Sequence, residues 1–93
     1  MNEGLRDELL RRMEEEQRLR SEWVDKADDP QFAEHIVEID SQNTAWLEKI
    51  IEAQGFPGLS VVEGDGLQAV FLLIQHSPNL EFQKKCLRLM ELA

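Results

Sequence analysis

The sequence is poor in cysteine, tyrosine and basic residues, and it has no long apolar run. Cys86 is the one cysteine among 93 residues, so no intramolecular disulfide can form and no cysteine-based metal site is indicated. A reducing compartment is therefore expected. No stretch approaches the roughly 18 apolar residues that span a membrane, and the acidic N-terminal residues are not typical of a signal peptide. These absences favour a cytoplasmic protein of bacterial type.

The shortage of basic residues excludes one class of partner. The chain has 19 Asp and Glu residues against 10 Lys and Arg residues, and its net charge is −9. Binding to a nucleic-acid backbone needs a surplus of basic residues on one face, so no nucleic-acid partner is expected. Residues 79–93 are the exception, with three basic residues against two acidic ones. The two histidines, His35 and His76, are too far apart in sequence for a metal-site spacing, and we expect neither a metal nor a cofactor.

The apolar residues recur with the period of a helix and predict one domain over residues 1–93. The expected helices cover about residues 3–26, 30–54, 65–77 and 79–92. Asp29 before Pro30 indicates the start of the second helix, and Gly55 indicates its end. Residues 55–63 are predicted to form a packed loop, followed by Asp65 as the N-cap of the third helix.

The third predicted helix sets the expected architecture. Residues 69–74 (AVFLLI) are all apolar, and a helix that is hydrophobic all round must be surrounded by other elements. We therefore expect an all-α, compact four-helix domain in which the other helices enclose the hydrophobic third one.

Polar residues occur on the helix faces that the apolar periodicity predicts to be buried. Burying an unpaired polar group costs about 1–3 kcal/mol, so these side chains pair with one another, reach water or line a cleft. His76 is suited to proton transfer near neutral pH, and Asp40 could orient it, which makes both candidate catalytic residues. The candidate ligand-binding residues are Gln17, Arg20, Asn43 and Gln75.

Structural roles are the alternative for the same side chains. His76 could cap a helix end and interact with its dipole. Arg20 could form an ion pair with Asp40 or Glu16, and Asn43 could make a structural hydrogen bond. Gln17 could simply reach water from the flank of its helix.

Short motifs follow one another in a recognisable order: Glu16-Gln17-x-x-Arg20, Asp40-x-x-Asn43-x-x-x-Leu47, Gly55-Phe56-Pro57, Gln75-His76 and Phe82-Gln83. This order resembles a widespread bacterial domain family of unknown function, over nearly the whole chain. Phe56 stands where that family usually has tryptophan. Relatives usually continue into a tail with tyrosine motifs, whereas this chain has no tyrosine and stops at Ala93. It is expected to be either a shortened relative or a trimmed part of a longer protein.

Two classes of function stay open. A polar pocket between the first three helices would bind a small polar ligand and could be enzymatic. Alternatively, the acidic surface would bind a protein partner, as a regulatory or immunity-type module without catalysis. The outward-facing residues for that role are Glu14, Glu15, Glu34 and Glu38. A homodimer through Trp23, Trp46 or the last helix is compatible with either class.

Overall fold

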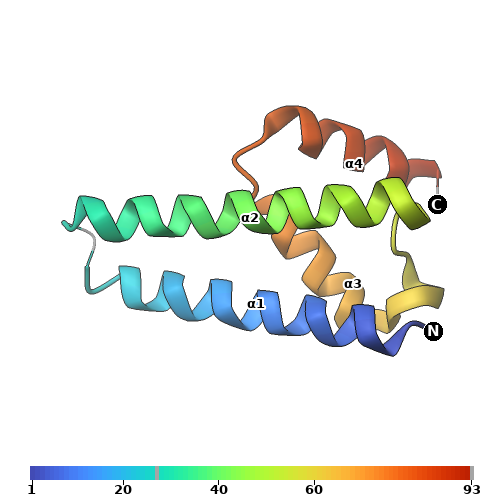
Figure 1. The fold of residues 1–93 in the computed structure, drawn as a ribbon, viewed down its shortest axis with the longest axis horizontal. Helices are drawn as coiled ribbons and strands as arrows, with labels where there is room; N and C mark the ends of the chain where they lie inside the picture. The colour runs from blue at the N-terminus through green and yellow to red at the C-terminus, as the bar shows by residue number, and fades with distance from the viewer. Residues whose placement is uncertain (27, 93) are drawn as a thin grey trace.

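The described part of the chain, residues 1–26 and 28–92 of a computed structural model, forms four α-helices. They are α1 (Glu3–Trp23), α2 (Pro30–Gln54), α3 (Leu59–Gln75) and α4 (Leu80–Leu92). The prediction of an all-α four-helix domain is confirmed. Helices α1 and α2 form a long antiparallel hairpin, and α3 and α4 form a shorter one beside it (Figure 1).

Short polar side chains cap the N-terminal ends of three of these helices. Asn2 Oδ1 accepts a hydrogen bond from the Leu5 amide at 3.0 Å, and Asp29 Oδ1 accepts one from the Gln31 amide at 3.0 Å. Asn79 Oδ1 does the same for the Phe82 amide at 3.0 Å. Each bond satisfies a backbone donor that has no partner within its own helix. The N-terminal ends of α1, α2 and α4 are thus set by local sequence.

Helix α3 starts earlier than predicted, and it is kinked. Residues 59–62 form a helical turn instead of the predicted packed loop, and Gly58, not Asp65, precedes the helix. The kink lies at Glu63, whose φ of 61° and ψ of −177° are not helical. The Asn2 amide donates to the Val61 carbonyl at 2.6 Å. This contact with the start of α1 holds the first turn in place.

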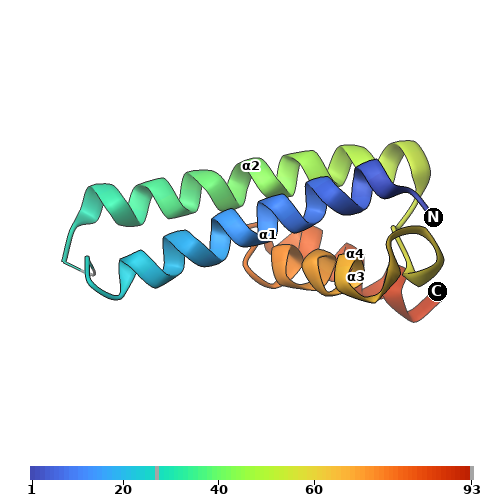
Figure 2. The same cartoon turned by 90° about the horizontal axis from the view of Figure 1, so that it is seen from below.

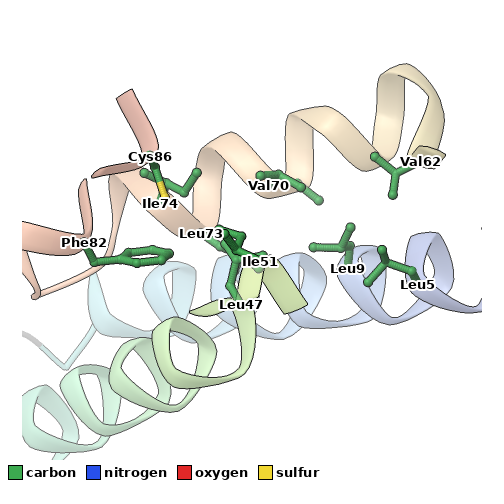
Figure 3. Close-up of a cluster of buried hydrophobic side chains, with 11 residues drawn as sticks. Leu5, Leu9, Leu47, Ile51, Val62, Val70, Leu73, Ile74, Phe82 and Cys86 are labelled. Carbon is green, nitrogen blue, oxygen red and sulfur yellow. The ribbon is translucent and has the colours of Figure 1, made fainter. Parts of the chain in front are cut away.

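The apolar core joins all four helices. Leu9, Leu47, Val62, Val70 and Cys86 have no exposed side-chain surface or almost none, and they belong to one continuous cluster (Figure 3). Burial raises the pKa of the Cys86 thiol to about 11, because the thiolate would lose its water. Cys86 is therefore an apolar core residue in this fold.

Helix α3 contacts each of the other three helices, but they do not enclose it. Phe71, at the middle of the predicted apolar run, is 42% exposed. The side of α3 that carries Phe71, next to α4, is therefore exposed to solvent. None of the helices in the described residues has the length and hydropathy that a membrane crossing requires.

The two hairpins differ in length, and this difference creates a corner. The C-terminal part of α1 and the N-terminal part of α2 extend past the end of α3 (Figure 2). The molecule is correspondingly long, with extents of 41 × 26 × 19 Å. At the corner, the C-terminal end of α3 meets the middle of α1 and α2.

Candidate functional site

Four ionisable side chains meet at this corner, and we call them the polar cluster: Glu16, Arg20, Asp40 and His76. Glu16 and Arg20 lie one turn apart on α1, Asp40 lies on α2, and His76 is the residue that ends α3. Three segments that are distant in sequence therefore supply one site.

Arg20 is the centre of the polar cluster. Its Nε donates to a Glu16 carboxylate oxygen, and its Nη2 donates to Asp40 Oδ2 at 2.6 Å. The Glu16 side chain is 1% exposed and that of Asp40 is 6% exposed, whereas Arg20 is 30% exposed. Two carboxylates have thus lost their water, and one guanidinium compensates both of them.

His76 approaches the same carboxylate. Its Nδ1 lies 2.5 Å from Glu16 Oε1 and 3.2 Å from Arg20 Nε. The shorter contact favours an Nδ1–H that donates to Glu16, and the other ring nitrogen, Nε2, then carries no proton in the neutral ring. With a neutral His76, the polar cluster has a net charge of −1, and protonation of the ring makes it neutral.

Asp40 is the member of the cluster whose ionisation is clearly perturbed. Burial raises the pKa of its carboxyl, and the charge of Glu16 acts in the same direction. The charges of Arg20 and His76 and the hydrogen bond from Arg20 oppose this shift without cancelling it. A carboxyl that holds its proton above the usual range can donate as well as accept a hydrogen bond.

A second group of polar side chains lies next to the cluster in sequence, one turn from Glu16 and Asp40 and beside His76. Arg12 Nη1 donates to Asn43 Oδ1 at 2.8 Å, and the Arg12 guanidinium stacks 4.3 Å from the centre of the Trp46 ring. The Thr44 and Ser77 hydroxyls lie 2.6 Å apart. Among the described residues, two buried atoms have no hydrogen-bond partner: Glu16 Oε2 and Asn43 Nδ2.

A small pocket opens beside the cluster, between α1 and α2. Its volume is about 170 Å³, and its lining is formed by Arg20, Trp23, Ala33, Ile36, Val37 and Asp40. Arg20 and Asp40 provide the polar wall, and the other four residues are apolar. No hydrogen bond from Arg20 Nη1 to the described residues is present, so donors of this guanidinium remain for a bound molecule.

The structure brings some of the candidate residues together and separates others. Arg20, Asp40 and His76 meet, and Asn43 lies one turn from Asp40 on α2. The side chains of Gln17 and Gln75 are exposed and lie outside the cluster. Arg20 holds both carboxylates, and His76 contacts that of Glu16; no ion pair between His76 and Asp40 is present among the described residues. Gln83 Nε2 donates to the Ile74 carbonyl at 3.0 Å and to the Ser77 carbonyl at 3.1 Å, so it caps the end of α3.

Sequence reasoning missed Arg12, and it named Glu16 only as a possible ion-pair partner of Arg20, not as the carboxylate that contacts His76. A signal for Glu16 was present, because it lies four residues before Arg20 and belongs to the same motif. Arg12 continues that spacing by one further turn. Among the described residues, no group of three His, Cys, Asp or Glu side chains has an arrangement that could hold a metal ion.

The fold and the site define a class: a small all-α domain in which a buried ion-pair cluster borders a pocket between helices. The chain belongs to a specific family, described as "Family of unknown function (DUF6624)", whose model matches residues 3–93. Neither a curated protein nor a solved structure was found that matches the chain.

Proposed function

We propose that this domain binds a small polar molecule in the pocket between α1 and α2. The observation that carries the proposal is the position of Arg20: the guanidinium is fixed by Glu16 and Asp40, yet it lines an open pocket. A side chain held on two sides is already in its binding conformation, so a ligand need not supply the free energy that orders it.

The polar wall of the pocket determines the ligand chemistry. Arg20 offers donors, and Asp40 beside it offers a carboxyl whose pKa is raised by burial. A ligand group that accepts and donates side by side, such as a primary carboxamide or a carboxylic acid in its protonated form, matches this pair. Trp23, Ile36 and Val37 form an apolar wall for a short hydrocarbon part.

The volume of the pocket limits ligand size. At about 170 Å³, the pocket is smaller than the roughly 300–1,000 Å³ of sites for drug-sized ligands. A ligand with the size of an amino-acid side chain fits best. In this proposal His76 acts through Glu16 and Arg20, because it contacts both residues and does not line the pocket.

Tryptophan fluorescence offers a direct test. The chain has two tryptophans and no tyrosine, so the variant Trp46→Phe leaves Trp23, in the pocket wall, as the only emitting residue. Titration of this variant with butyramide should give a saturable change, with a dissociation constant of about 1 mM or weaker for so small a ligand. Butylammonium, which lacks the acceptor oxygen, should bind more weakly than butyramide.

A matched pair of variants on α2 provides the control. Ala33→Leu in the Trp46→Phe background fills the pocket and should abolish the change. Ala45→Leu adds the same side chain at an exposed position of α2 outside this pocket and should leave the change intact. Circular dichroism of both variants establishes that they fold. A signal that does not saturate, or one that persists in Ala33→Leu, would contradict the proposal.

A further inference from the structure

The open side of α3 and the outer side of α4 form an apolar surface, which we call the α3–α4 face. It contains Leu59, Phe71 and Leu87, with exposures of 63%, 42% and 56%. A hollow of about 290 Å³ lies between Phe71 and Leu87 and is bordered by Met90. A second hollow of about 220 Å³ continues from Phe71 and Met90 toward Leu59. A contiguous apolar surface of this kind marks an interaction site.

The distribution of charge favours a second copy of this chain on the α3–α4 face. Two copies with a net charge of −9 repel each other. Helix α2 has five acidic residues and one basic residue, whereas α4 has three basic and two acidic residues. The α4 side is therefore the one on which two copies can approach with the least repulsion.

The order of residues along α4 makes this approach self-complementary. Leu80, Lys84, Leu87 and Glu91 are spaced by four, three and four residues, so they lie in one stripe along the helix. When two α4 helices pair antiparallel with the two-fold axis between Leu87 and Arg88, Lys84 of each copy lies level with Glu91 of the other. A two-fold axis forms this pair twice. Lys84 is free to do so, because its contact within the chain, with Glu81 at 3.9 Å, is long and exposed.

We propose that the α3–α4 face is a homodimer interface with two-fold symmetry. Leu87 of each copy packs against its counterpart and against Phe71 and Met90 at the hollow. The reciprocal pairs of Lys84 and Glu91 set the antiparallel orientation. The pocket between α1 and α2 is lined by other residues, so the dimer and the proposed ligand site are independent.

Sedimentation equilibrium over protein concentrations from about 1 μM to about 1 mM tests the dimer. The apparent mass should rise from that of a monomer, 10.8 kDa, to twice this value. Leu87→Glu should raise the dissociation constant at least about tenfold, as expected for a central apolar contact. Val37→Glu is the matched control. Val37 is 54% exposed, close to the 56% of Leu87, but it lies on α2, in the N-terminal half of that helix and outside the α3–α4 face. It should leave the dissociation constant unchanged within about twofold.

Charge exchange then tests the orientation. Lys84→Glu and Glu91→Lys should each weaken the dimer by about threefold or more, although they change the net charge in opposite directions. An equimolar mixture of the two variants should dimerise like the wild type, because both cross-copy pairs are again of opposite sign. The double variant, with Lys84→Glu and Glu91→Lys in the same chain, should dimerise like the wild type without being mixed with another variant.

A mass that stays monomeric at the highest concentration overturns the proposal. So does equal weakening by Leu87→Glu and Val37→Glu, which would assign the effect to added charge. A mixture of Lys84→Glu and Glu91→Lys that remains as weak as the separate variants rules out the antiparallel pairing and with it this interface.

Discussion

Glu16 and Asp40 lose nearly all of their water on folding, and a single guanidinium faces both of them. Removing one member of such a buried group leaves the others uncompensated, which typically costs 3–5 kcal/mol. The cost is a reason to regard the cluster as more than a stabilising device, since apolar residues of similar volume would serve stability at least as well. Its position beside a pocket supports a binding role.

The perturbed carboxyl of Asp40 leads to a prediction about pH. Because burial raises the pKa of Asp40 in the folded state, the folded protein holds this proton more tightly than the unfolded chain. The contribution to stability is complete below the unfolded pKa of about 4 and is lost as the pH rises through the folded pKa. The stability of the wild type minus that of Asp40→Asn should therefore fall as the pH rises from about 4.

Urea unfolding of the two proteins at a series of pH values measures this difference. The charged groups around Asp40 are Arg20, Glu16 and His76, and all three are present in both proteins. A difference that stays constant or increases with pH would show that the pKa of Asp40 is not raised.

The sequence could predict which helix faces hold polar residues but not which side chains meet. Helical periodicity turned Arg20, Asp40 and Asn43 inward, and all three are half-buried or buried. Glu16 and Gln17 flank the same apolar stripe on opposite sides. Which of the two is buried depends on the side of α1 on which the end of α3 lies. Glu16 faces His76, and Gln17 faces solvent. That placement is set by tertiary packing, which no local pattern encodes.

At the scale of elements, the first turn of α3 shows the same limit. Residues 59–62 have no capping side chain before them, and a single helical turn is not stable in isolation. The turn forms because the Val61 carbonyl accepts from the Asn2 amide and because Arg6 pairs with Asp65 just beyond the kink. The other three helices have their own caps. The local sequence therefore indicates where these three helices begin.

The kink of α3 contains strain that a substitution should release. Glu63 has a φ of 61° and a ψ of −177°, a conformation that glycine adopts freely and that costs other residues about 1–3 kcal/mol. Glycine loses more conformational entropy on folding, which offsets part of the gain. We predict that Glu63→Gly raises the free energy of unfolding by about 1 kcal/mol.

Glu63→Ala is the control for this prediction. It removes the same carboxylate, which lies 3.8 Å from Arg6 Nε, but it keeps the Cβ and thus the backbone strain. Glu63→Ala should not stabilise the protein. Chemical denaturation compares the three proteins, and equal stability of the glycine and alanine variants would assign the effect to the lost charge instead.

At the scale of the whole molecule, the unequal lengths of the two hairpins separate three surfaces. The pocket lies between α1 and α2, the α3–α4 face lies on the shorter hairpin, and acidic side chains cover much of the outside of α2. Three of its exposed acidic residues, Glu34, Glu38 and Glu52, have no ion-pair partner within 4.0 Å among the described residues. Self-repulsion of this charge opposes the compact state.

The acidic surface of α2 leads to a prediction about salt and charge. Glu34 and Glu38 are one turn apart and repel each other, and Glu38→Lys converts this repulsion into an attractive pair with the acidic residue first. The variant should be more stable than the wild type by about 0.5 kcal/mol at low salt, and the gain should shrink toward zero near 1 M NaCl, where charges beyond about 3 Å are screened. The wild type itself should gain stability with added NaCl over the same range.

Glu81→Lys on α4 separates local geometry from total charge. It changes the net charge of the protein by the same amount, but it replaces an attraction to Lys84 with a repulsion. Thermal unfolding at a protein concentration low enough to keep the chain monomeric should show stabilisation by Glu38→Lys and none by Glu81→Lys. If both variants stabilise equally, the total charge governs stability. If neither does, the acidic surface of α2 is screened well enough to carry no cost, and its charge is then available for a partner without weakening the fold.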